Sequence, residues 1–235
     1  MKKIPYKSFL PIYSLVLLGF FIIAAGGSRA VTAWSASAPV AGRKTVVIDA
    51  GHGGVDGGAT SCTGVLESQF NLEIATKLND LMHLLGVKTY MIRDTDRSIY
   101  TQGETIAQKK ISDLRERVRI VNSIENCVLI SIHQNHFSDS KYSGAQVFYP
   151  ATTGSRELSS KLQDNIKNTL NPGSHRGIKK ADGIYLMQHI NCPGSLIECG
   201  FLSNPQEEYM LRSQEYQQKL CSVIACTLST WLWGT

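Results

Sequence analysis

The chain has 235 residues, of which 43% are hydrophobic and 18% are charged, and this composition is typical of a globular protein with one sizeable core. Its formal charge of +5 does not indicate nucleic-acid binding, because four of the 24 basic residues precede residue 39 and the others are nearly balanced by 19 acidic residues. Low-complexity sequence and internal repeats are absent, which excludes a disordered chain and a solenoid.

Residues 1–38 have the pattern of an export signal. Three lysines precede an apolar run of about 17 residues, and the sequence ASA at residues 36–38 has the form of a cleavage site. Pro39 disfavours cleavage, and the apolar run is at the short limit for a membrane span. We therefore predict an exported chain with a cleaved signal peptide or an N-terminal membrane anchor at residues 1–38, a linker at residues 39–44 and a catalytic domain at residues 45–235.

The apolar residues of that domain alternate between the periodicities of strands and helices. In chain order they predict a strand at 45–50, a helix at 67–85, a strand at 87–92, a helix around 111–121, strands at 128–132 and 144–149, a helix at 155–170, a strand at 195–198 and a helix around 220–231. Such alternation favours a single α/β domain in which helices cover both faces of the sheet.

The six cysteines, at positions 62, 127, 192, 199, 221 and 226, include no CxxC motif and do not indicate a disulfide scaffold. We interpret most of them as small buried hydrophobic residues, and their connectivity cannot be derived from the sequence.

Three polar residues lie where strands end or helices begin. His52 follows the first strand in DAGHGG, Glu67 begins the first helix, and His133 terminates the strand VLISIH. Sheets in α/β proteins place their sites at strand ends, and hydrolytic zinc takes three nitrogen or oxygen ligands and leaves a fourth position to water. Each residue could instead have only a structural role: the histidines could be hydrogen-bonded residues without a metal, and Glu67 could stabilise the N-terminus of its helix. The three residues are also too far apart in the sequence to form a local metal-binding motif.

Glu198 is a fourth candidate, because it ends the apolar strand LIE. A carboxylate there is unfavourable unless it is solvated, paired or near a metal. Beside a zinc-bound water it could act as a general base, whereas a structural salt bridge is the alternative.

The segments VVIDAGHGGVDGGA, SIHQN and PGSLIECGFLSNP, with Glu67, stand in the order found in zinc-dependent N-acetylmuramoyl-L-alanine amidases. The chain resembles this family, amidase-3, over residues 44–232. The resemblance implies that His52, Glu67 and His133 bind one zinc ion and that Glu198 is catalytic. It also implies a mixed six-stranded sheet flanked by helices, and hydrolysis of the amide between N-acetylmuramic acid and L-alanine in peptidoglycan.

Further segments, among them KKISDLRERVRIVN and SGAQVFYP, are similar to family members that act on the spore cortex of endospore formers. This similarity implies a step toward the muramic-δ-lactam needed for germination, a location in the forespore envelope, and a lipoprotein partner such as some relatives have. The chain departs from the family pattern at Ala50, Gln134 and Cys199.

Two further residues are candidates for substrate binding. Asn135 could orient substrate or His133, and Arg176 could contact peptide carboxylates, although a turn-forming asparagine and a solvated basic loop are the alternatives. We interpret His136 as a bystander and Cys62 as a loop thiol.

Three other functions stay open at this point. A vegetative cell-wall autolysin would have the same chemistry, and a zinc carboxypeptidase acting on the stem peptide would have a similar ligand set. A catalytically inactive peptidoglycan-binding module is the third.

Overall fold

The computed structural model describes residues 44–234. The predicted signal peptide or anchor and nearly all of the predicted linker lie outside the described residues. Within residues 44–234, no helix combines the length and the hydropathy that a membrane span requires.

Six strands form one mixed sheet, in agreement with the predicted fold. They are β1 (Thr45–Ala50), β2 (Thr89–Met91), β3 (Cys127–Asn135), β4 (Gln146–Tyr149), β5 (Lys179–Lys180) and β6 (Gly194–Phe201), arranged in the order β2-β1-β3-β6-β4-β5. The strands β2, β1, β3 and β6 are parallel to one another, whereas β4 pairs antiparallel with β6. The carboxyl ends of β1, β3 and β6 therefore meet at one edge of the sheet.

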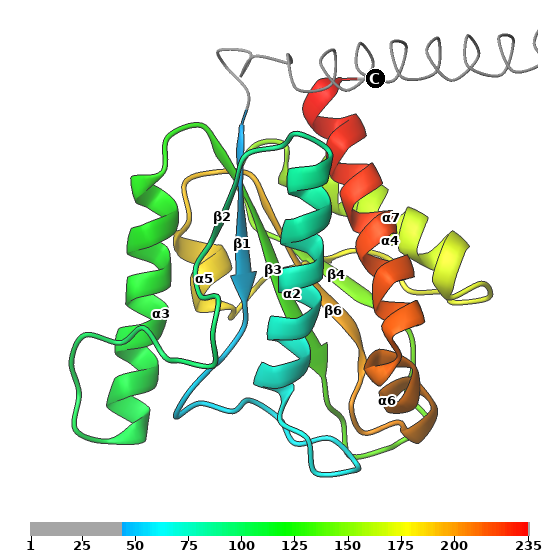
Figure 1. The fold of residues 1–235 in the computed structure, drawn as a ribbon, viewed down its shortest axis with the longest axis horizontal. Coiled ribbons are helices and arrows are strands. Elements are labelled where there is room, and N and C mark those ends of the chain that lie inside the picture. The colour runs from blue at the N-terminus through cyan, green and yellow to red at the C-terminus, as the bar shows by residue number, and fades with distance from the viewer. Residues whose placement is uncertain (1–43, 235) are drawn as a thin grey trace, which may run out of the picture. The chain divides into compact units, whose positions relative to one another are not determined.

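Helices cover both faces of this sheet (Figure 1). They are α2 (Glu67–Leu84), α3 (Ile106–Ser123), α4 (Ser155–Leu170), α5 (Tyr185–His189), α6 (Pro205–Arg212) and α7 (Gln214–Trp233). Helices α2, α4 and α7 pack on one face of the sheet, and α6 lies on the same side. Helices α3 and α5 pack on the other face.

Successive residues of β1 point to opposite faces, as the pleat of a strand requires. Val46 and Ile48 belong to the core beneath α2, α4 and α7, whereas Val47 belongs to the core beneath α3 and α5. Every residue of β1 is buried and four of its six residues are aliphatic, as is typical of a strand in a parallel sheet covered on both faces. Burial of each such aliphatic side chain contributes about 1.5–3 kcal/mol.

The structure corrects two predicted strand ends. Strand β3 continues two residues past His133, and β6 continues three residues past Glu198. The two residues pair directly with each other between these strands, and this pairing extends both strands beyond their apolar runs. The short elements β5, α5 and α6 were not predicted, although α6 has the start signal of an asparagine N-cap, Asn204, followed by Pro205.

Helix α3 was predicted, but its buried face is largely polar. Its buried residues are Ser112, Asp113, Arg117 and Val121. Ile111, which belonged to the predicted apolar face, is 50% exposed. The helix therefore contributes hydrogen bonds, rather than only apolar packing, to the region beside the end of β1.

Candidate metal centre and active site

The three predicted metal ligands meet at the carboxyl ends of β1 and β3. Their ligand atoms all lie within 4.8 Å of one another. His52 Nε2 lies 3.2 Å from Glu67 Oε2, and His133 Nδ1 lies 3.0 Å from Glu67 Oε1. The carboxylate is therefore placed between the two imidazole rings, and the three side chains form a candidate metal site.

This donor set fits a zinc ion. Zinc prefers imidazole nitrogen and carboxylate oxygen at about 2.0–2.2 Å, which places tetrahedral ligands about 3.4 Å apart. The two nitrogen–oxygen separations of 3.0 and 3.2 Å are close to that value. Among residues 44–234, this is the one group of three histidine, cysteine or acidic side chains with such proximity.

Buried hydrogen-bond donors fix the Glu67 carboxylate. Its Oε2 accepts from the Ala59 backbone N–H at 3.0 Å, and its Oε1 accepts from the Gln134 N–H at 3.2 Å and from Asn71 Nδ2 at 3.3 Å. The Gln134 side chain in turn donates to Asn71 Oδ1 at 3.2 Å. Gln134 is one of the positions that depart from the family pattern, and its side chain extends the hydrogen bonds around Glu67. Burial opposes ionisation, but the hydrogen bonds and charges of the His133 and His52 imidazoles hold the pKa of Glu67 well below its usual range.

Asp56 orients the first histidine. His52 Nδ1 lies 2.9 Å from Asp56 Oδ2, which leaves Nε2 facing Glu67. Burial lowers the pKa of His52, but hydrogen bonds to Asp56 and Glu67 outweigh it and raise the pKa to about 9 in the metal-free protein. A carboxylate on the distal nitrogen of a metal-binding histidine fixes the tautomer and the ring orientation. Sequence reasoning missed Asp56, although it follows His52 by four residues in GHGGVD.

Two buried arginines hold the backbone around His52, whose φ of 61° is unusual for a residue other than glycine. Arg117 donates to the carbonyl oxygens of His52 at 2.7 Å and Ala50 at 3.0 Å. Arg93 donates to the carbonyl oxygens of Ala50 at 2.8 Å and Gly51 at 3.0 Å. These donors satisfy buried carbonyl groups and stabilise the conformation that directs the His52 ring to the site.

Arg117 is itself paired with two carboxylates. It forms ion pairs with Asp49 and, at 2.6 Å, with Asp113. Asp49 also accepts from Ser131 Oγ at 2.6 Å. Burial raises the pKa of Asp49, but Arg117, His133 and Ser131 together hold it below its ordinary value. Buried charges require such complete pairing, and the network connects β1, β3 and α3 behind the metal ligands.

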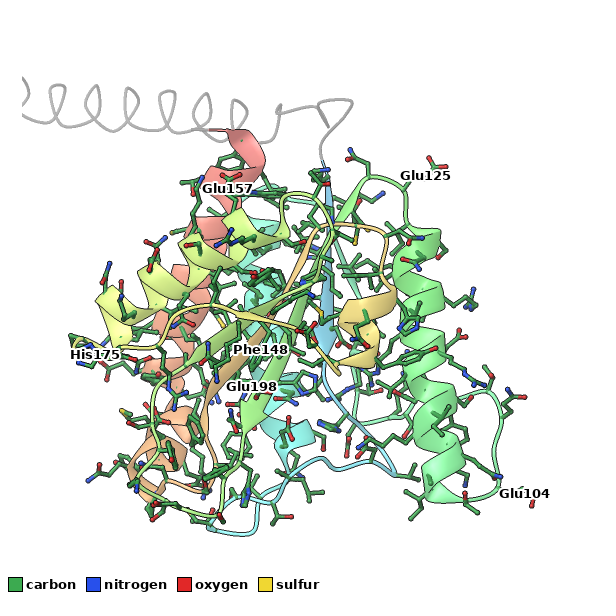
Figure 2. All side chains as sticks on the ribbon, turned by 180° about the vertical axis from the view of Figure 1, so that it is seen from behind. Glu104, Glu125, Phe148, Glu157, His175 and Glu198 are labelled. Carbon is green, nitrogen blue, oxygen red and sulfur yellow. The ribbon has the colours of Figure 1, made fainter. Side chains whose placement is uncertain are left out.

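Glu198 faces the same pocket from β6. It pairs with His133 in the sheet, and it lines the pocket together with His52 and His133. Its Oε2 atom is buried and has no hydrogen-bond partner among the described residues. Figure 2 shows Glu198 near the middle of the view, whereas Glu104 and Glu125 lie toward its edge.

Burial raises the pKa of Glu198 to about 7 in the metal-free protein, although the two histidines partly oppose this shift. A carboxyl group with a pKa near neutrality can both accept and return a proton. A buried carboxylate oxygen without a partner is unfavourable on its own. The position of Glu198 is therefore suited to proton transfer beside a metal-bound substrate.

Asn135 and Arg176 do not line this pocket. The Asn135 carbonyl oxygen accepts from the Leu202 N–H at 2.8 Å. The Arg176 guanidinium lies 4.8 Å from the Phe201 ring centroid, and its Nε donates to the Ser143 carbonyl oxygen at 2.8 Å. The roles of Asn135 and Arg176 in substrate binding stay predictions.

Cys62, Cys199 and His136 lie outside the metal cluster. Cys199 is fully buried, which fits its interpretation as a packing residue. Cys62 and His136 are exposed.

Gly51 leaves room for the His133 ring, since a Cβ atom at this position would overlap that ring. We expect Gly51→Ala to displace His133 and to weaken metal binding by roughly 10–100-fold, which is the effect of disturbing the support of a ligand. Competition with a fluorescent chelator measures this affinity. Gly177→Ala is the matched control, because a Cβ there meets open space and the φ of Gly177 is not positive. Equal zinc affinity of the two variants would show that the glycine is not needed at the site.

Comparisons with known proteins give one consistent result. The family described as N-acetylmuramoyl-L-alanine amidase matches residues 46–229. The germination-specific N-acetylmuramoyl-L-alanine amidase of Bacillus subtilis (strain 168) is 37% identical over 225 residues, which cover 95% of this chain and 92% of that protein. The N-acetylmuramoyl-L-alanine amidase AmiA of Escherichia coli (strain K12) is 27% identical over 78% of this chain and 74% of its own.

Solved structures agree with these sequence matches. The CwlD amidase from Clostridioides difficile, solved in complex with the GerS lipoprotein, has a TM-score of 0.78 and 37% identity, and the match covers 82% of this chain and all of that chain. An N-acetylmuramoyl-L-alanine amidase from Clostridium difficile 630 has a TM-score of 0.71 and 31% identity, with 82% of this chain and 98% of that chain covered.

Proposed function

Because the chain belongs to the N-acetylmuramoyl-L-alanine amidase family, we propose that His52, Glu67 and His133 bind one zinc ion that serves its reaction. The reaction is hydrolysis of the amide between N-acetylmuramic acid and L-alanine in peptidoglycan. The observation that supports this proposal is the meeting of two imidazoles, one ionised carboxylate and the partly buried Glu198 around one pocket. When bound, zinc would supply a Lewis acid that acidifies water and polarises the scissile carbonyl.

Glu198 moves the proton in this mechanism. The Glu198 side chain lines the pocket, and no described residue hydrogen-bonds to its Oε2 atom, so the carboxylate is available to take the proton of the attacking water. The water oxygen adds to the carbonyl carbon, and Glu198 then gives the proton to the nitrogen of L-alanine as the carbon–nitrogen bond breaks. The products are a free lactyl carboxylate on the sugar and a stem peptide with an L-alanine amino terminus.

The other residues of the site hold His52 and its backbone in place and do not take part in the reaction. Asp56 holds the His52 ring through Nδ1, and Arg117 and Arg93 hold the backbone beneath it. Such preorganised support keeps ligands within the narrow geometry that catalysis requires.

The substrate we propose is spore-cortex peptidoglycan, in the forespore envelope, on the way to muramic-δ-lactam. The similarity over 95% of this chain to a germination-specific relative supports this assignment over that of a vegetative autolysin. The structural neighbour solved with the GerS lipoprotein supports a lipoprotein partner for this chain as well. Residues 1–38 would export the chain, as a cleaved signal or as an anchor.

Product analysis tests the proposed reaction. The zinc-loaded full-length chain is incubated with cortex-type peptidoglycan, and the soluble products are identified by mass spectrometry. We expect intact stem peptides that begin with L-alanine. Free amino acids would instead indicate a carboxypeptidase, and peptidoglycan binding without any product would indicate a binding module, so either result would contradict the proposal.

A further inference from the structure

Two of the six cysteines lie next to each other at the amino-terminal end of the sheet. Cys127 is the first residue of β3, and Cys192 lies two residues before β6. The two strands are parallel, and from the pair Leu129–Gly194 to the pair His133–Glu198 each β6 residue lies opposite the β3 residue 65 positions earlier. Cys127 and Cys192 have the same separation, so they face one another in the same register.

The strands remain paired down to these cysteines. The Leu129 N–H donates to the Pro193 carbonyl oxygen at 2.9 Å, which continues the ladder to the residue after Cys192. Cys127 and Cys192 also line one pocket beside Lys44, and both side chains belong to or pack against the core on the face of the sheet that α3 and α5 cover. The two cysteines are therefore neighbours on one face of adjacent strands.

The spacing of the strands suits a covalent link. Neighbouring strands lie about 4.7–4.9 Å apart, and disulfides join Cα atoms about 4.4–6.8 Å apart. A bond between the two sulfur atoms therefore needs rotation of side chains but no movement of either strand. We propose that Cys127 and Cys192 form a reversible disulfide bond that ties β3 to β6.

The oxidant is a disulfide, either of a small thiol or of a dithiol oxidoreductase. Cys192 is partly exposed, so its thiolate attacks that disulfide first, releases one thiol and forms a mixed disulfide. Cys127, which is buried behind it, then displaces the second thiol and closes the protein disulfide. Two cysteine thiols are thereby oxidised, and the external disulfide is reduced to two thiols.

The bond would act on stability rather than on the reaction itself. His133 and Glu198 lie six residues further along the same two strands, at the opposite end of the sheet. A link between Cys127 and Cys192 closes a loop of about 65 residues and restricts the unfolded chain, which we expect to raise Tm by roughly 5–15 °C.

The experiment compares reduced full-length protein with the same protein after incubation with oxidised glutathione. We expect the oxidised sample to give one linked peptide that contains Cys127 and Cys192 and is two hydrogen atoms lighter than the two reduced peptides together, and we expect this sample to melt at a higher temperature. Cys192→Ser should abolish both the link and the rise in Tm. Cys226→Ser, at an exposed position on α7, is the matched control and should retain both.

Peptide mapping of the unmutated protein keeps the test independent of how the variants fold. If a maleimide labels both Cys127 and Cys192 after oxidation, or if the linked peptide joins other cysteines, the proposal is wrong. It is also wrong if the link forms and Tm does not change, because the strands would then not be held by it.

Discussion

Replacement of Glu198 by glutamine is expected to lower kcat for peptidoglycan on the order of 10³-fold while one zinc ion remains bound per chain. Glutamine has the same shape as glutamate but cannot take a proton from water. Since Glu198 is not among the three proposed metal ligands, its replacement leaves their donor set complete. Stopped assays of released stem peptide measure kcat, and elemental analysis measures bound zinc.

The thermal stability of the variant distinguishes a loss of catalysis from a loss of folding. Because burial raises the pKa of Glu198 from 4.5 to about 7, ionisation of this group destabilises the metal-free protein progressively between these two pH values and fully above pH 7. Glu198→Gln should therefore leave Tm at pH 8 unchanged or higher. Glu104→Gln, at an exposed position, is the matched control and should leave both kcat and Tm unchanged. An active Glu198→Gln variant, or one that had lost its zinc, would refute the assigned role.

Replacement of His133 by alanine is expected to remove the metal and to make activity undetectable. Disturbing a supporting residue already lowers zinc affinity by roughly 10–100-fold, so loss of a ligand should have a larger effect. It would also leave Glu67 Oε1 without its imidazole neighbour at 3.0 Å. Elemental analysis and chelator competition measure the zinc content and its dissociation constant.

His136→Ala is the matched control for this variant. His136 lies three residues further along the chain and is exposed, so its removal should change neither zinc content nor kcat. Circular dichroism of both variants checks that the fold is retained. A His133→Ala variant that still bound zinc with the original affinity would exclude His133 as a ligand.

The strongly periodic parts of the fold could be predicted from the sequence. Helix α4 has the predicted bounds, and α2 differs from its prediction by one residue at its end. The ends of β3 and β6 could not be predicted, because the pairing of His133 with Glu198 extends these strands beyond their apolar runs. The buried polar face of α3 was also missed, since its Arg117 is stabilised by carboxylates and carbonyl groups distant in the sequence.

For the candidate site, too, one part could be predicted from the sequence and another part could not. The sequence placed His52, Glu67 and His133 at positions that α/β proteins use for ligands, and the structure brings their ligand atoms together. Their supporting groups could not be identified, because Arg93 and Arg117 act through backbone carbonyl groups and leave no spacing signal. The contact between Cys127 and Cys192 likewise depends on the register of two strands.

Anomalous diffraction from crystals of the zinc-loaded protein, measured on both sides of the zinc absorption edge, tests the metal centre most directly. We predict one strong peak within bonding distance of His52, Glu67 and His133, with Glu198 beside it and not bound to the ion. A peak at other side chains, or no peak in protein that contains zinc, would contradict the assignment of these three residues.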